Sequence, residues 1–138
     1  VVTSPDYTTL STTMHAVKVA KGKNIPITGL ILNRVYNKKF ELSLQDIEQA
    51  TDVPVVCVLG HDTRVLEALA LTKPFVSHAP RSNSVVELKK LGAFITGEDY
   101  RDSRFSSKFR KLFGGIPKQE VNRNLILHKK ELVSNYQP

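Results

Sequence analysis

The sequence predicts a parallel α/β sheet with flanking helices. Two short apolar runs rich in β-branched residues are continuous enough to form strands buried on both faces. Segments with helical periodicity precede, separate and follow these runs, and such an alternation of strand and helix is typical of a parallel sheet. A length of 138 residues allows one domain with a substantial core.

The predicted strands are residues 27–35 (ITGLILNRV) and 53–59 (VPVVCVL), and residues 1–3 form the end of another strand. Cys57, the only cysteine, lies inside the second run and is predicted to be a core residue. A single cysteine excludes an internal disulfide and indicates a reducing compartment.

Helical periodicity predicts a first helix over residues 8–21 and a second over 43–50, which opens with Ser43 as a cap. The apolar stripe of the first comprises Leu10, Met14, Val17 and Ala20. Residues 63–71 and 83–94 read as two more helices, the latter capped by Ser82 or Asn83, and residues 98–104 read as a polar linker.

The sequence contains neither a membrane-spanning segment nor a signal peptide by pattern. No run approaches about 18 consecutive apolar residues. The first ten residues are neither basic nor continuously apolar. Because the chain begins with valine, it is also consistent with being part of a longer protein.

Positive charge is concentrated at the end of the chain. Residues 1–100 hold 11 basic and 10 acidic residues, whereas residues 101–138 hold 9 basic and 3 acidic, so six of the seven net charges lie in the last segment. A basic excess confined to one segment indicates an anionic surface, either lipid or nucleic acid. Interleaved Phe and Leu favour lipid over nucleic acid.

Residues 101–115 predict an amphipathic helix that lies in a membrane interface. Its apolar stripe comprises Phe105, Phe109, Leu112 and Phe113. Its other faces carry Arg101, Arg104, Lys108, Arg110 and Lys111, and two glycines end it. The alternative is an ordinary amphipathic helix that packs on the core with its basic face in water.

Polar residues stand where the two predicted strands end, at the edge where parallel sheets bind ligands. Asn33 and Arg34 close the first strand, and the amide of Asn33 matches the hydrogen-bonding edge of adenine. Asp62 follows the second strand. As alternatives, Asn33 is a turn residue that bonds its own backbone, and Asp62 is a helix cap. His61 is assigned no chemistry.

These motifs together resemble the MinD branch of the MinD/ParA ATPases over about residues 1–115. The resemblance rests on Asn33-Arg34 after an apolar strand, a Val-rich strand that ends in Gly-x-Asp, Lys73-Pro74-Phe75-Val76, Pro80, the helix over 84–94 and the terminal FRKLFGG. It implies the second half of a P-loop NTPase fold, with residues 1–100 as a partial nucleotide-binding domain and residues 101–138 as a basic tail.

The resemblance implies a membrane-associated, ATP-dependent protein that positions the cell-division septum. Its cofactor would be ATP or ADP, with Asn33 on the adenine, Arg34 beside it and the loop up to Asp62 supplying backbone contacts. Its partners would be an anionic membrane, a second copy in an ATP-dependent homodimer and a cell-division inhibitor. It would be peripheral on the inner membrane face, in the cytoplasm or the plastid stroma.

The chain departs from the family pattern in one respect that concerns activity. It contains no GxxxxGK[ST] phosphate loop. The family places that loop, its catalytic lysines and its magnesium ligands ahead of the segment seen here, so we expect no ATP hydrolysis by this chain alone. Residues 116–138 extend beyond the point where many relatives stop.

Two other classes of function fit the same sequence. One is a basic-tailed module that binds nucleic acid, including a ParA-like partitioning module. The other is a soluble nucleotide-dependent enzyme in which the helix over 101–115 has only a structural role.

Overall fold

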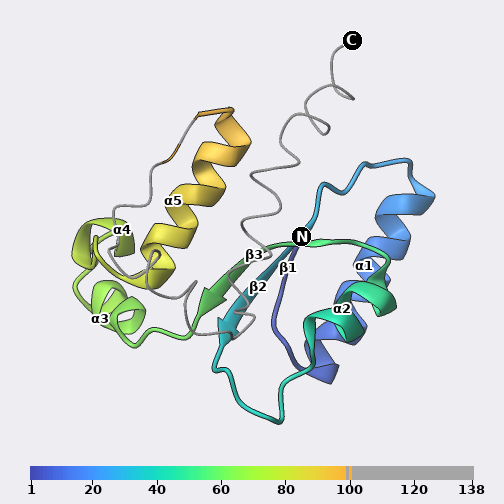
Figure 1. The fold of residues 1–138 in the computed structure, drawn as a ribbon, viewed down its shortest axis with the longest axis horizontal. Coiled ribbons are helices and arrows are strands. Elements are labelled where there is room, and N and C mark those ends of the chain that lie inside the picture. Colours follow the sequence, from blue (N-terminus) through green and yellow to red (C-terminus); the bar gives the residue numbers. More distant parts are fainter. Residues whose placement is uncertain (99, 101–138) are drawn as a thin grey trace, which may run out of the picture.

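The computed structural model describes residues 1–98 and 100. In this part of the chain, three strands alternate with two helices, and three more helices follow the last strand (Figure 1). The elements are β1 (Val2–Thr3), α1 (Tyr7–Gly22), β2 (Leu30–Val35), α2 (Leu44–Thr51), β3 (Val55–Gly60), α3 (Arg64–Ala70), α4 (Phe75–His78) and α5 (Asn83–Thr96).

The three strands form one parallel sheet in the order β1-β2-β3, so each strand pairs with the next along the chain. Val2 lies opposite Ile31, and Val35 lies opposite Gly60. Parallel neighbours require a crossover connection, and α1 and α2 supply the two crossovers. The predicted α/β fold with a parallel sheet and flanking helices is therefore confirmed.

Strands β2 and β3 begin later than the sequence predicted. Strand β2 begins at Leu30 instead of residue 27, and β3 begins at Val55 instead of residue 53. Leu30 and Val55 are register partners, and the amide of Leu30 donates to the carbonyl of Pro54 (2.8 Å). Pro54 has no N–H to contribute to a ladder, so the paired region starts after it. Just before β2, Gly29 passes so close to Val56 that a Cβ on Gly29 would overlap the Val56 side chain.

Side chains cap the helices that form the crossovers. Asp6 accepts a hydrogen bond from the amide of Thr9 (2.8 Å) at the start of α1. At the start of α2, the Ser43 hydroxyl accepts from the amide of Asp46 (3.1 Å), and the Asp46 carboxylate accepts from the amide of Ser43 (3.2 Å). This reciprocal pair is a capping box, and it confirms the predicted helix start at Ser43.

Helices cover the strands from two sides. Figure 1 shows α1 and α2 on one side of the strands and α5, which packs against β3, on the other. Cys57 of β3 and Val85 of α5 are buried, which confirms that Cys57 is a core residue. The core beside α1 and α2 consists of Leu10, Val17, Leu30, Leu32, Val35, Leu42, Ile47, Val53 and Val55.

The buried face of α1 differs from the predicted stripe. Met14 is 43% exposed, and Thr13 is buried in its place. The Thr13 hydroxyl donates to Thr3 in β1 (2.8 Å), so a hydrogen bond to the strand fixes the rotation of the helix. The prediction for Met14 was wrong because an apolar pattern does not reveal a buried Thr–Thr contact.

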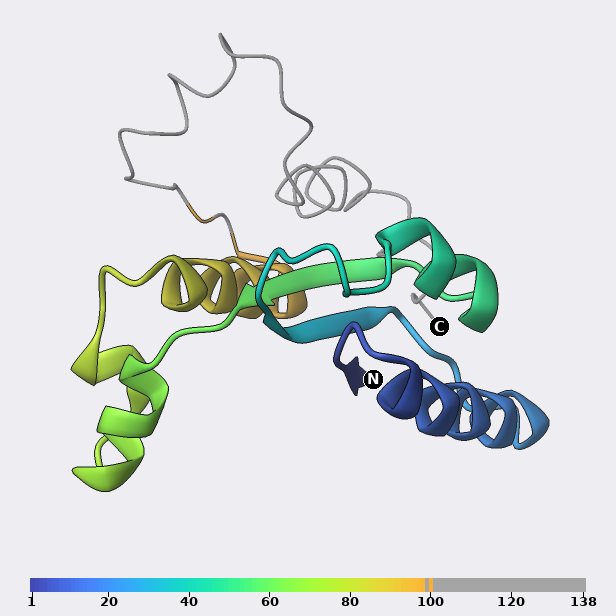
Figure 2. The same ribbon diagram turned by 90° about the horizontal axis from the view of Figure 1, so that it is seen from below.

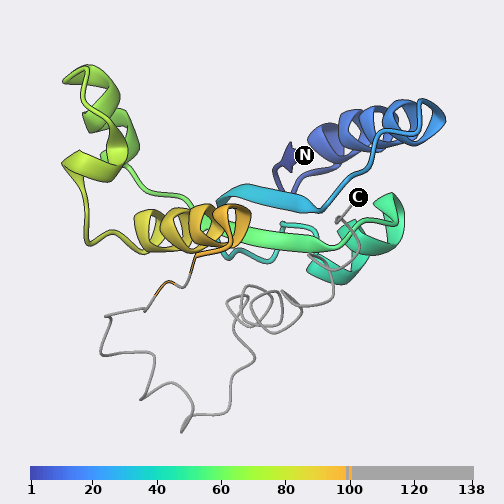
Figure 3. The same ribbon diagram turned by 90° about the horizontal axis from the view of Figure 1, so that it is seen from above.

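Two short helices lie beyond the carboxyl end of β3. Helix α3 was predicted, whereas α4, which follows Pro74, was not. The turned views show that α3 and α4 lie together and project away from the sheet (Figure 2 and Figure 3). None of the helices among the described residues is long and apolar enough to cross a membrane.

Candidate functional site

The carboxyl ends of β2 and β3 lie side by side and place their following loops together. Val35 and Gly60 are register partners at these ends. The ladder continues one step further, because the amide of His61 donates to the carbonyl of Val35 (2.9 Å). Ligands of parallel α/β sheets bind outside this edge. The residues after each strand are therefore the candidates for a binding site.

Asn33 and Arg34 form an irregularity near the end of β2. The register with β3 shifts between Leu32 and Val35, and Arg34 has a φ of 56°. The amide of Arg34 donates to the Asn33 side-chain oxygen (2.9 Å), as expected of a residue that bonds its neighbouring backbone. Both side chains are exposed. The Asn33 amide group has two N–H donors and a second lone pair beyond this bond.

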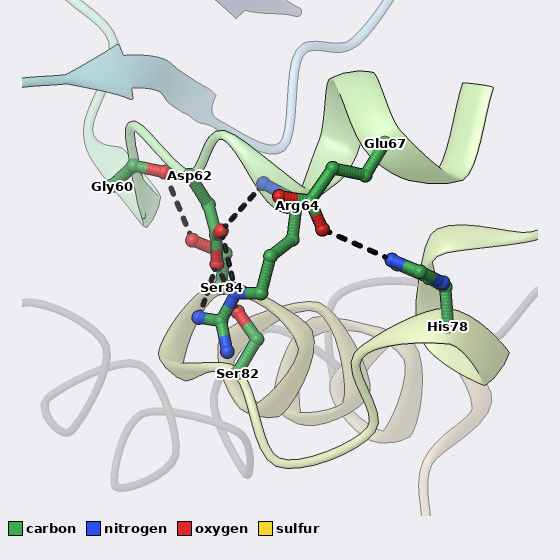
Figure 4. A network of polar contacts seen from close by, with 7 residues as sticks. All are labelled: Gly60, Asp62, Arg64, Glu67, His78, Ser82 and Ser84. Atoms are coloured by element: carbon green, nitrogen blue, oxygen red, sulfur yellow. Dashed lines mark hydrogen bonds and ion pairs between the residues drawn. The ribbon is translucent and has the colours of Figure 1, made fainter. Parts of the chain in front are cut away.

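Asp62 is the centre of a polar network that ties the β3 loop to α3 and to the start of α5 (Figure 4). The Arg64 guanidinium donates to both carboxylate oxygens, through Nε (2.8 Å) and Nη2 (2.7 Å). The backbone amide of Arg64 and the Ser82 hydroxyl also donate to this carboxylate, at 3.0 and 2.6 Å. The Asp62 side chain is only 10% exposed. The N-cap position of α3 is occupied by Thr63, without a side-chain cap, so the alternative in which Asp62 is the N-cap of this helix was wrong, although Asp62 does accept from the amide of the first helical residue.

The network determines the ionisation of Asp62. Hydrogen bonds from Arg64, with a further one from Ser82, hold the pKa of the Asp62 carboxyl well below its usual range. Asp62 is therefore a carboxylate throughout the physiological range, with its oxygens directed to groups of the protein itself.

Two further contacts fix the surroundings of the network (Figure 4). The Ser84 hydroxyl in the first turn of α5 donates to the carbonyl of Gly60 (2.9 Å), which holds the end of β3 against α5. Glu67 in α3 and His78 in α4 approach within 3.3 Å, which links the two projecting helices. Ser82 takes the predicted cap position of α5, but its hydroxyl bonds Asp62 instead of an amide of that helix.

A pair of aromatic rings at this edge was not assigned a function from the sequence. Tyr36 and His61 are the first residues after β2 and β3, and their rings stack with centroids 4.4 Å apart and an interplanar angle of 22°. The signal in the sequence was an aromatic residue directly after each strand. Which rings meet depends on the register, which a single sequence does not specify.

The chemistry of this arrangement suits a planar heterocycle. The amide of Asn33 supplies donors and an acceptor, and the ring pair supplies an aromatic surface. Among residues 1–98 and 100, no group of three or more His, Cys, Asp or Glu side chains is placed to hold a metal ion. Arg34, which directly follows Asn33, is exposed and adds a positive charge to this group of side chains.

The residues proposed to contact the membrane lie outside the described part of the chain. They are Phe105, Lys108, Phe109, Arg110, Lys111, Leu112 and Phe113. Their assignment stays a prediction from the sequence.

No protein-family profile matches the sequence. It is 32% identical over 121 residues to an uncharacterised ATP-binding protein of Methanocaldococcus jannaschii, a match that covers 83% of this chain and 46% of the relative. The chain thus spans about half the length of the curated relative that it matches.

Solved structures of MinD proteins share the fold. The septum site-determining protein MinD from Pyrococcus horikoshii, complexed with Mg-ADP, matches with a TM-score of 0.60 and 25% identity, covering 70% of this chain and 42% of that one. The cell division ATPase MinD of Pyrococcus furiosus matches with a TM-score of 0.62 and 26% identity, covering 69% and 40%. A MinC:MinD complex from Aquifex aeolicus matches in fold, with a TM-score of 0.65 at 13% identity, covering 75% and 43%.

Proposed function

Because the chain resembles the MinD cell-division ATPases in fold over about 70% of its length, we propose that it is part of a membrane-associated, ATP-dependent protein that positions the site of cell division. The observation that carries the proposal is the carboxyl edge of the sheet, where Asn33 and Arg34 stand beside the loop that Asp62 shapes. This edge supplies the base-binding side of a nucleotide site.

In this proposal the three predicted nucleotide-site residues have different roles. The amide of Asn33 pairs with the edge of adenine, and Arg34 lies beside it. Asp62 holds the loop between β3 and α3 through Arg64 and Ser82, so that backbone groups of the loop face the base. Asp62 is then a positioning residue, and Asn33 is a contact residue.

The basic segment 101–115 is the proposed membrane anchor. Each basic residue near an anionic membrane contributes roughly 1 kcal/mol, and one short amphipathic helix therefore binds reversibly. In a nucleotide-dependent dimer, binding of the first helix to the membrane gives the second helix a high effective concentration at the membrane surface, so the dimer binds more tightly than one chain. ATP binding would thereby control membrane attachment through a second copy of the chain.

A regulator of cell division is the proposed protein partner. The support for it is the Aquifex aeolicus structure, in which MinD is solved together with MinC. The matched chain is only 13% identical to this one, so the likeness supports the fold alone. The complex nevertheless suggests a class of partner to test.

Flotation with anionic vesicles tests the membrane part of the proposal. Phe109→Glu places a charge on the apolar stripe and should abolish vesicle binding, while the free energy of unfolding changes by less than about 1 kcal/mol, as at a surface position. The matched control is Phe40→Glu, because Phe40 is 78% exposed in the loop between β2 and α2. This control should float like the wild type. Retained binding by the Phe109 variant would contradict the proposal.

The concentration of positive charge in residues 101–138 supports one second candidate, binding of nucleic acid. Phosphate contacts lose affinity steeply as salt rises. Tight DNA binding that falls with salt, together with a failure to float, would favour this alternative. Unfolding of the chain by Phe109→Glu would instead indicate that residues 101–115 pack on the core.

A further inference from the structure

Tyr36 and His61 are an exposed, stacked pair of rings at the edge where the proposed nucleotide site lies. Tyr36 directly follows β2 and His61 directly follows β3. Their centroids are 4.4 Å apart with an interplanar angle of 22°, which is near-parallel stacking. Tyr36 is 47% exposed and His61 is also exposed, so the pair is not part of the core.

The backbone on both sides of the pair is fixed. The amide of Tyr36 donates to the Glu41 carboxylate (2.7 Å), and the same carboxylate accepts from the amide of Lys38 (2.9 Å). On the other strand, the amide of His61 donates to the carbonyl of Val35 (2.9 Å). The backbone that carries the rings is therefore ordered before any ligand arrives, and the rings stack on each other, which lowers the entropy lost on binding.

Aromatic side chains held in this way suit a nucleobase. Bases stack on Tyr and His rings, and every base has a π-face for this contact. The pair lies at the carboxyl ends of two adjacent parallel strands, where ligands of such sheets bind. Asn33, three residues before Tyr36, supplies the polar groups that pair with the edge of a base.

We propose that Tyr36, with His61 stacked on one face of its ring, forms on its other face a stacking platform for a purine base, with Asn33 at the edge of that base. The two-ring system of a purine offers more π-surface to the platform than a pyrimidine does. The inference deepens the proposed function and rests on it, because it identifies the surface on which the base of the nucleotide lies. It also gives His61 a role at the site.

Adenosine is the probe that isolates this contact, since it carries the base without phosphates. The full chain, labelled with ¹⁵N, is titrated with adenosine and, in parallel, with uridine, and amide shifts are recorded by NMR. We expect the shifts to centre on residues 33–36 and 60–62, with adenosine binding more tightly than uridine. Nuclear Overhauser contacts from the adenine protons to the Tyr36 ring are expected in the wild-type chain.

Two substitutions at one position separate the ring from the hydroxyl. Tyr36→Ala should weaken adenosine binding about tenfold, which lies within the range for loss of a base–aromatic stack. Tyr36→Phe keeps the ring and should bind within about twofold of the wild type. The contacts from adenine to the Tyr36 ring are measured on the wild-type chain, so they test the platform even if the alanine variant does not fold.

The outcomes distinguish this inference from the proposed function. Adenosine shifts at Asn33 and Arg34 without contacts to Tyr36, and with unchanged affinity in Tyr36→Ala, would overturn the platform and leave the proposed function standing. Equal binding of adenosine and uridine would overturn its purine preference. No adenosine shift at millimolar concentration anywhere in the chain would overturn the platform together with the proposed base site.

Discussion

At the scale of single residues, Arg34 carries a backbone conformation that costs free energy. Its φ of 56° lies in the left-handed region, which is unfavourable by roughly 1–2 kcal/mol for a residue with a Cβ. The hydrogen bond from its amide to Asn33 offsets part of this cost. Such local strain persists where the surrounding structure fixes it, and it is concentrated at functional sites. The irregularity places the side chains of Asn33 and Arg34 near the carboxyl end of β2.

Replacing Arg34 by glycine tests whether its positive φ strains the backbone. Arg34→Gly should raise the free energy of unfolding by up to about 1 kcal/mol, because glycine adopts positive φ without a Cβ clash. The control is Lys39→Gly, which removes the same charge at an exposed turn position without positive φ and should lower stability by about 0.4–1 kcal/mol, because glycine raises the entropy of the unfolded chain. Urea unfolding of both variants measures the difference. If Arg34→Gly lost as much stability as the control, the claim that the positive φ of Arg34 strains the backbone would be contradicted.

At the scale of elements, the close approach of Gly29 to Val56 joins the start of β2 to β3. A Cβ at position 29 would overlap the Val56 side chain. Gly29→Ala should therefore lower the free energy of unfolding by about 1–3 kcal/mol, as overpacking does. Gly92→Ala is the matched control, because a Cβ at this position in α5 would meet no described atom within 4 Å apart from its chain neighbours and the backbone of its own helix.

The control should gain up to about 1 kcal/mol from the better helix propensity of alanine. Thermal unfolding of the two variants compares them directly. An equal effect of both substitutions would show that the approach of the two strands does not require glycine.

The network around Asp62 makes the attachment of α3 and α5 sensitive to acid. The pKa of Asp62 is lowered in the folded chain, so its contribution to stability is complete above the unfolded value near pH 4 and is lost as pH falls below that value. Asp62→Asn should cost about 1–3 kcal/mol at pH 7, as for loss of hydrogen bonds to a charged group. Its stability should then fall less steeply than that of the wild type between about pH 4 and pH 2.

Asp52→Asn is the control for this prediction. Asp52 pairs with Lys21 at 2.7 Å, but its side chain is 92% exposed, and a surface ion pair contributes little. Chemical unfolding at several pH values gives the comparison. Parallel stability curves for the wild type and Asp62→Asn would show that the network does not stabilise the fold through the charge of Asp62.

The elements were predictable where the signal is local. Ser43 and Asp46 form their capping box within one turn, and β-branched runs gave both long strands. Contacts between elements were not predictable. The pairing of Tyr36 with His61 and of Thr13 with Thr3 depends on register and helix rotation, which arise only when the sheet assembles. Helix α4 was missed because four residues are too few to show periodicity.

At the scale of the whole molecule, the described part of the chain resembles MinD proteins and spans less than half the length of each one compared. Its open edge offers an amide and two rings for a base, and the sequence has no GxxxxGK[ST] motif for phosphates. A base stack contributes about 1–3 kcal/mol and each hydrogen bond about 0.5–1.5 kcal/mol. One stack and two hydrogen bonds in the middle of these ranges together contribute about 4 kcal/mol, which corresponds to about millimolar affinity.

The dissociation constants of ATP and adenosine, measured side by side on this chain by equilibrium dialysis, test this account most directly. We expect both to be about 1 mM or weaker and to agree within about threefold, since binding comes from the base alone. Micromolar affinity for ATP, far tighter than for adenosine, would contradict the account, because it would require phosphate contacts that the sequence does not predict.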